Sequence, residues 1–183
     1  MMSDDKETTL QQVVGWWHGL QPVPEKNQPG DRAALAMLRR CSSVMDALFV
    51  PETQVLVHRC GARDDAKIAR LALVAAVCAH VRRDRPDILI ARQVGPVDLK
   101  DRATAACKPL RFRRLMDAAT YDECLRAFRR LVALAGREVS VKDLARALMM
   151  WPREGAYGDG GEERIRREWM RQYWDAGRSY QEQ

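Results

Sequence analysis

Lys108 to Leu131, KPLRFRRLMDAATYDECLRAFRRL, is the segment around which the chain is organised. It contains six arginines against three acidic residues, and its pattern predicts two consecutive amphipathic helices. Pro109 suits the first turn of the first helix. Thr120 and Glu123 have the spacing of a capping box at the start of the second helix.

The second of these helices separates apolar from basic residues when its side chains are placed at 100° intervals. One side carries Leu125, Phe128, Leu131, Val132 and Ala135, and the other carries Arg126, Arg129, Arg130 and Arg137. The apolar side must face a core. The arginine side faces either water or an anionic partner, and the choice between these two decides the function.

Apolar periodicity and helix-start signals also recur on both sides of these two predicted helices, along the whole chain. One helix is expected over residues 10–20, and another after Asp31, continuing through residues 43–50. The longest is expected to begin after Asp64 or Asp65 and to end near Arg83. Arg82, Arg83 and Arg85 would then lie at its C-terminal end, where they favour the helix dipole.

These signals predict an all-α fold of seven to nine helices without significant sheet. Pro and Gly between residues 86 and 109 suggest a connection between two small helical lobes, at about residues 10–95 and 101–176. Residues 1–8 and 177–183 are expected to be flexible tails, and the glycine-rich segment 155–161 to be a mobile loop. Ile165, Trp169 and Tyr173 form one stripe of the last predicted helix.

The charge balance favours a polyanionic partner. The net charge is +6 and the isoelectric point is about 9.3. Only six of the 31 basic residues are lysine, and arginine offers a planar donor fork that suits phosphate. A GC-rich genome would also replace lysine by arginine, so composition leaves both explanations open.

No catalytic or metal-binding pattern is present in the sequence. The five cysteines contain no CxxC pair, which favours reduced, mostly buried thiols over a disulfide framework or a zinc site. The three histidines have no carboxylate partner in motif spacing. We therefore expect no enzyme activity, cofactor or metal.

No targeting or membrane-spanning segment is recognised. The acidic, polar start MMSDDKETT is unlike a signal peptide, and the longest apolar run is about half a membrane span. A soluble protein of the cytoplasm is expected.

The binding role is open between three alternatives. In the first, the arginine faces follow a sugar-phosphate backbone without reading bases. In the second, residues 138–151 are half of a helix-turn-helix, but the recognition helix would fall on the loop WPREGAYGDGGEE. In the third, the chain is a helical adaptor that binds only protein. The pair Trp16 and Trp17 is interpreted as core anchors in preference to a stacking platform for bases.

The order of several short motifs resembles a known family. A tryptophan pair is followed by GDRAALAMLRR at Gly30 to Arg40, LRFRRL at Leu110 to Leu115, RAFRR at Arg126 to Arg130 and an aromatic last helix. Over about residues 10–175 the chain is similar to the CasB family, the small subunit of the type I-E CRISPR surveillance complex, Cascade.

The resemblance implies that the chain is an all-helical, non-catalytic subunit of an RNA-guided complex that acts in prokaryotic antiviral defence. Its expected partners are the crRNA–target heteroduplex, the displaced single-stranded DNA, the backbone and large subunits, and a second copy of itself. It also implies binding of nucleic acid without sequence preference and stabilisation of the R-loop. The candidate backbone contacts that match the family's basic motifs are Arg32, Arg39, Arg40, Arg111, Arg113, Arg114, Arg126, Arg129 and Arg130.

Overall fold

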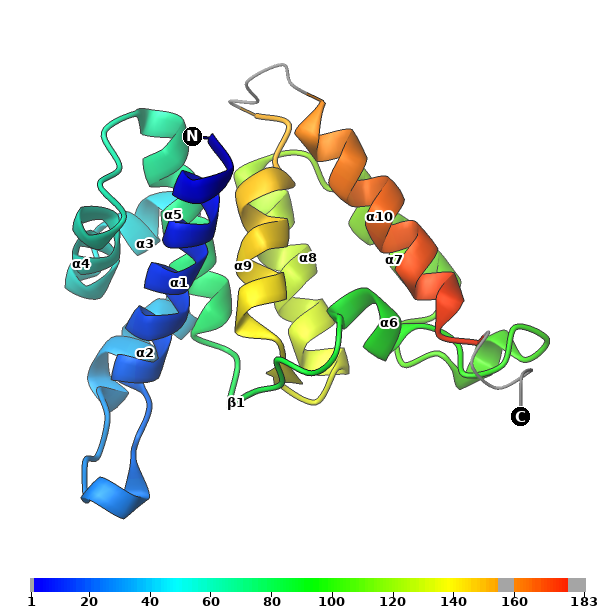
Figure 1. Cartoon of the computed structure of the whole chain (residues 1–183), viewed down its shortest axis with the longest axis horizontal. Coiled ribbons are helices and arrows are strands. Elements are labelled where there is room, and N and C mark those ends of the chain that lie inside the picture. The colour runs from blue at the N-terminus through cyan, green and yellow to red at the C-terminus, as the bar shows by residue number, and fades with distance from the viewer. Residues whose placement is uncertain (1, 155–159, 178–183) are drawn as a thin grey trace.

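The computed structural model describes residues 2–154 and 160–177, and most of these residues are helical (Figure 1). The α-helices in the described part are α1 (Met2–Leu20), α2 (Arg32–Arg40), α3 (Val44–Leu48), α4 (Pro51–Arg59), α5 (Asp65–Cys78), α6 (Ile90–Val94), α7 (Pro109–Asp117), α8 (Tyr121–Leu134), α9 (Val141–Met150) and α10 (Gly161–Asp175). Two short 3₁₀ turns lie at Pro24–Lys26 and Arg102–Thr104. The predicted all-α class is confirmed.

The ten α-helices of the described residues exceed the predicted seven to nine because the helix predicted from Asp31 through residue 50 is divided into α2 and α3. The prediction that residues 43–50 continue α2 was wrong. Ser43 accepts from the backbone N–H of Asp46, whose side chain in turn accepts from the Ser43 N–H, so a capping box starts α3 as a separate helix. Pro51 then begins α4.

The helix predicted from Asp64 to about Arg83 ends earlier, at Cys78, and the prediction of its C-terminal end was wrong. Arg83–Asp84 instead forms strand β1, which pairs in parallel with β2 (Glu138–Val139). The backbone N–H of Arg82 donates to the carbonyl of Arg137 at 2.7 Å, and that of Arg85 donates to Val139 at 3.1 Å. These long-range hydrogen bonds replace the intrahelical ones, so the arginines of this segment do not cap a helix.

The first helix begins at Met2, so residues 2–8, predicted as a tail, are helical. Both tryptophans near its end are 2% exposed. The indole of Trp16 donates to the carbonyl of Glu52 at 2.9 Å, and that of Trp17 donates to Cys78 at 3.0 Å. They are core anchors, as predicted, since buried indoles with a satisfied N–H join α1 to α4 and α5.

Helix α5 lies at the centre of the packing, in contact with α2, α3, α4, α8 and α9. Helix α9 also packs against α1, and α6 packs against α10. One hydrophobic core therefore runs through both halves of the chain, and the boundary between lobes stays a prediction.

The last helix places its predicted stripe in this core, with Ile165, Trp169 and Tyr173 fully buried. The Tyr173 hydroxyl donates to the carbonyl of Cys107 at 2.6 Å. The predicted loop 155–161 and tail 177–183 lie mostly outside the described residues. Gly160 and Gly161 are described, as the N-cap and the first residue of α10.

Candidate nucleic-acid interface

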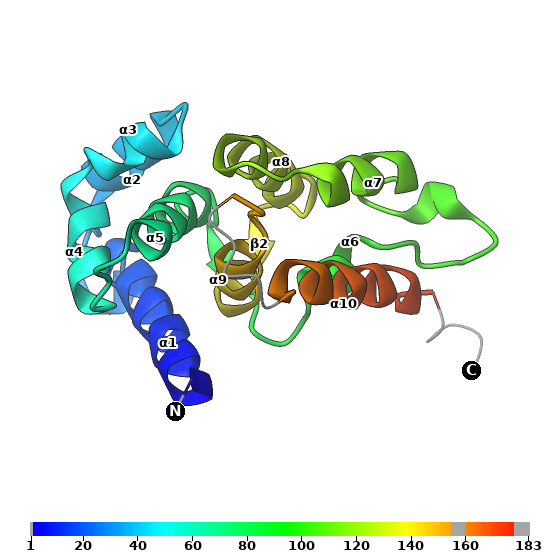
Figure 2. The ribbon, with the colours of Figure 1, turned by 90° about the horizontal axis from the view of Figure 1, so that it is seen from above.

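The arginine-rich stretch forms the helical hairpin that its sequence predicts. Pro109 is the first residue of α7, and Phe112, Leu115 and Met116 bury one face of this helix. Helix α8 starts with the predicted capping box, in which Thr120 accepts from the N–H of Glu123 at 3.3 Å. Seen from above, α7 and α8 run along one edge of the molecule (Figure 2).

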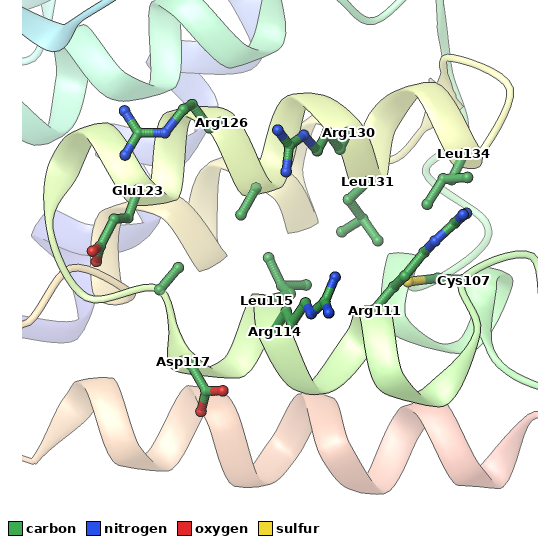
Figure 3. A pocket seen from close by; sticks show the side chains of 12 residues that line it. Cys107, Arg111, Arg114, Leu115, Asp117, Glu123, Arg126, Arg130, Leu131 and Leu134 are labelled. Carbon is green, nitrogen blue, oxygen red and sulfur yellow. The ribbon is translucent and has the colours of Figure 1, made fainter.

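A groove of about 400 Å³ lies between the two helices of the hairpin (Figure 3). It is lined by Cys107, Arg111, Arg114, Leu115, Asp117, Ala118, Glu123, Arg126, Ala127, Arg130, Leu131 and Leu134. Arg111 and Arg114 come from α7, whereas Arg126 and Arg130 come from α8. The buried side chains of Leu115 and Leu131 separate the two basic rows, so the arginines flank an apolar floor.

All four of these arginines are exposed. Within the described residues, none of them has a carboxylate within ion-pairing distance. The carboxylate of Glu123 accepts instead from the backbone N–H groups of Ala119 and Thr120, and these hydrogen bonds lower its pKa, with a smaller effect from Arg126. The groove thus keeps donor forks that are open to an anion.

The turn between α7 and α8 is held by Arg166 of α10, a residue that is only 5% exposed. Its guanidinium donates to the carbonyls of Met116 at 3.0 Å, Ala118 at 2.8 Å and Trp151 at 2.9 Å. It also lies 5.0 Å above the ring centroid of Trp151. This one side chain therefore holds the C-terminal end of α7, and with it one end of the groove.

The nine predicted contact residues separate into three groups. Five of them lie exposed on the hairpin: the four of the groove and Arg113, which does not line it. Arg32 and Arg40 are exposed on α2. Arg39 and Arg129 are only partly exposed and hydrogen-bond to backbone carbonyls.

The two partly exposed arginines bind the C-terminal ends of helices. Arg129 donates to the carbonyls of Cys41 at 2.5 Å and Leu38 at 3.2 Å, which joins α8 to the end of α2. The Nε of Arg39 donates to the carbonyl of Ala79 at 2.6 Å, just after α5. Free carbonyls at helix ends attract cations, so these contacts account for both residues as links between helices.

Sequence reasoning missed two basic residues that share a pocket with Arg32 and Arg39. Arg82 and Arg83 line this second concavity, which lies between α1, α2 and β1. The sequence signal for this pocket is the cluster of arginines at residues 82–85. The prediction placed these arginines at the end of the long helix, but that helix ends earlier, at Cys78.

The described residues contain no group of three or more His, Cys, Asp or Glu side chains placed to hold a metal ion. All five cysteines are free thiols, and four of them are buried. In the part of the chain that the structure describes, no helix combines the length and hydropathy needed to cross a bilayer.

Fold and groove together define a small, arginine-rich, all-helical protein with a basic groove on a helical hairpin. Residues 34–174 match the family model described as CRISPR-associated protein Cse2, and the chain belongs to this family. The family, also called CasB, provides the small structural subunit of type I-E Cascade, so the chain is part of a complex with other subunits. No match was found among curated proteins or among solved structures.

Proposed function

We propose that this Cascade subunit binds nucleic-acid backbone without sequence preference and stabilises the R-loop during antiviral defence. Its nucleic-acid partners are the crRNA–target heteroduplex and the displaced DNA strand. Its protein partners are the backbone and large subunits and a second copy of itself. It performs no catalysis, and it works in the prokaryotic cytoplasm.

The observation that carries this proposal is the hairpin groove. Four exposed arginines flank it from two helices and have no carboxylate partner in the described structure. Each guanidinium can donate two hydrogen bonds to one phosphate, and the groove offers no ring or amide aimed at base edges. Such a surface follows a backbone and leaves the sequence unread.

The energetics of the R-loop make such contacts effective. Guide–target pairing reads the sequence, and the heteroduplex is about as stable as the duplex it replaces. A few phosphate contacts on the opened strands therefore shift the balance towards the open state.

The two alternatives are less well supported. A helix-turn-helix joins its helices by a turn of about three to four residues. Here residues 151–160 separate α9 from α10, so among the described helices α10 does not follow α9 at this spacing. A protein-only adaptor would need no row of unpaired arginines on each side of one groove.

The double substitution Arg126→Ala with Arg130→Ala tests the proposal in the isolated full-length protein. Both side chains are exposed, so the fold should be kept. Binding to single-stranded DNA should weaken alike for all sequences, and the slope of log K against log salt should fall by about 0.7 for each lost contact.

The matched control is Arg59→Ala with Arg63→Ala, which removes the same charge from exposed positions near the end of α4. Helix α4 lies at the end of the molecule opposite α7 (Figure 2). Equal binding and equal slopes for the groove variant and the control would show that the groove is not the binding surface. A preference for one duplex sequence would favour a regulator instead.

A further inference from the structure

The pocket between α1, α2 and β1 is a second concave surface, apart from the hairpin groove. Its volume is about 680 Å³, within the range of roughly 300–1,000 Å³ that ligand sites occupy. It is lined by Trp17, His18, Gln21, Pro22, Arg32, Leu35, Arg39, Arg82, Arg83 and Asp84. Arginine is thus the most frequent residue of the lining.

The positive charge of this pocket is largely unneutralised. Arg32 and Arg82 are exposed, and the described residues place no carboxylate in ion-pairing distance of either. Among the described carboxylates, Arg83 reaches only Glu138, at 3.8 Å, and both side chains are exposed to water. An exposed pair of this kind contributes little.

The only carboxylate of the lining, Asp84, is already engaged. Its Oδ1 accepts from the backbone N–H of Val141 at 2.9 Å, and its Oδ2 lies 3.6 Å from Nε2 of His18. Asp84 therefore binds the first N–H of α9, and among the described residues its carboxylate forms no ion pair with an arginine of the lining.

The chain adds further positive charge behind the pocket. Arg137 has a left-handed backbone, with φ of 63°, directly after Gly136 with φ of 72°. A non-glycine residue pays roughly 1–2 kcal/mol for this conformation. Burial lowers the pKa of Arg39, and the neighbouring charges of Arg137 and Arg82 lower it further. Gathering like charges in a partly buried place destabilises a protein unless an anion binds among them.

We propose that this pocket binds a phosphate group of a nucleic-acid strand, as a second contact beside the hairpin groove. The inference rests on the proposed function. Helix α8 forms one side of the groove and leads directly into β2, which pairs with β1 at the pocket. The pocket therefore lies within a few residues of the C-terminal end of α8, and two basic surfaces at one helix favour an extended nucleic-acid strand over an acidic protein segment.

The test compares four full-length proteins: wild type, the pocket variant Arg32→Ala with Arg82→Ala, the groove variant Arg126→Ala with Arg130→Ala, and the Arg59/Arg63 control. Each is titrated with a labelled polythymidine strand long enough to cross α8, at several salt concentrations. Losing two phosphate contacts lowers the salt slope by about 1.4, so a fourfold rise in salt should weaken the pocket variant about sevenfold less than wild type. Circular dichroism checks that each variant stays folded.

The outcomes separate the two proposals. A pocket variant that binds like the control overturns the inference, whatever the groove variant does. An unaffected groove variant beside a weakened pocket variant overturns the groove and leaves the pocket. Strands with and without a 5′-phosphate distinguish a terminal phosphate from the backbone, and either dependence supports the site. If Arg32 and Arg82 are needed for binding polyglutamate but not DNA, the pocket is a protein-docking site and the proposal is wrong.

Discussion

Replacing Arg166 by methionine should be among the most destabilising single changes in the chain. The side chain is nearly buried, and it donates to the carbonyls of Met116 and Ala118 at the end of α7 and of Trp151 at the end of α9. It also donates to Glu162 of its own helix at 3.0 Å. Methionine has a side chain of similar length to arginine and is apolar enough for the core, but it has no hydrogen-bond donor.

The magnitude follows from the carbonyls that would be left behind. A hydrogen bond to a charged group contributes about 1.5–3 kcal/mol, and these contacts are not additive because they share one guanidinium. A buried carbonyl that is left without its donor costs about 1–3 kcal/mol. We expect a loss of about 4 kcal/mol in the free energy of unfolding, which lowers Tm by about 8–16 °C in a chain of this size.

Urea unfolding followed by circular dichroism measures this loss, with Arg167→Met as the matched control. Arg167 is the next residue of α10, but its side chain is exposed, so its change should stay within about 0.5 kcal/mol. Arg166→Lys should fall between the two, since an ammonium cannot fork towards several carbonyls. If Arg166→Met unfolds at the same urea concentration as Arg167→Met, the assigned role of Arg166 at the α7–α8 turn is wrong.

Two further predictions concern stability. Burial and the charges of Arg129, Arg39 and Arg137 lower the pKa of His80 to about 4, so the unfolded chain binds this proton first, at its usual pKa of about 6.5. The free energy of unfolding should therefore fall as the pH drops from about 6.5 to 4. Urea titrations at several pH values should show a flatter fall for His80→Gln than for the wild type. An identical pH profile in the two proteins would show that His80 is not shielded from protonation. Gly95→Ala would force a Cβ against the carbonyl oxygen of Tyr173 and should lower the free energy of unfolding by about 1–3 kcal/mol. The control Gly19→Ala meets nothing within 4 Å and should not lower it. Thermal unfolding measures both changes. Equal melting temperatures for the two alanine variants would contradict the close packing of α6 on α10.

The hairpin could be predicted from the sequence because its signals are local. The capping box of Thr120 and Glu123, the proline at the first turn of α7 and the buried stripe of α8 depend on residues within one or two helical turns. The caps by Asp31 and Asp64 were local in the same way.

The β1–β2 pair could not be predicted, because two residues per strand carry no periodicity. It is held by hydrogen bonds between segments far apart in the chain, and these end α5 before the arginines that were expected to extend it. The second basic pocket was missed for the same reason, since Arg82 and Arg83 reach it only through this pairing.

The roles of Arg39 and Arg129 show a second limit. A helical projection gives the direction of a side chain around its own helix, but not what the neighbouring helix presents there. Arg129 and Arg130 are adjacent in sequence, yet the first binds the end of α2 and the second lines the open groove. Only tertiary packing separates a basic residue that links helices from one that is available to a ligand.

The most direct test of the central claim is the lifetime of the R-loop in reconstituted Cascade. Complexes assembled with wild-type subunit, with Arg126→Ala and Arg130→Ala, or with the Arg59/Arg63 control are bound to a matched target, and strand reclosure is followed by fluorescence. Loss of two phosphate contacts at physiological salt should shorten the R-loop lifetime roughly tenfold for the groove variant and leave the control unchanged. Equal lifetimes for all three complexes, with the variant subunit fully incorporated, would contradict the claim that this groove stabilises the R-loop.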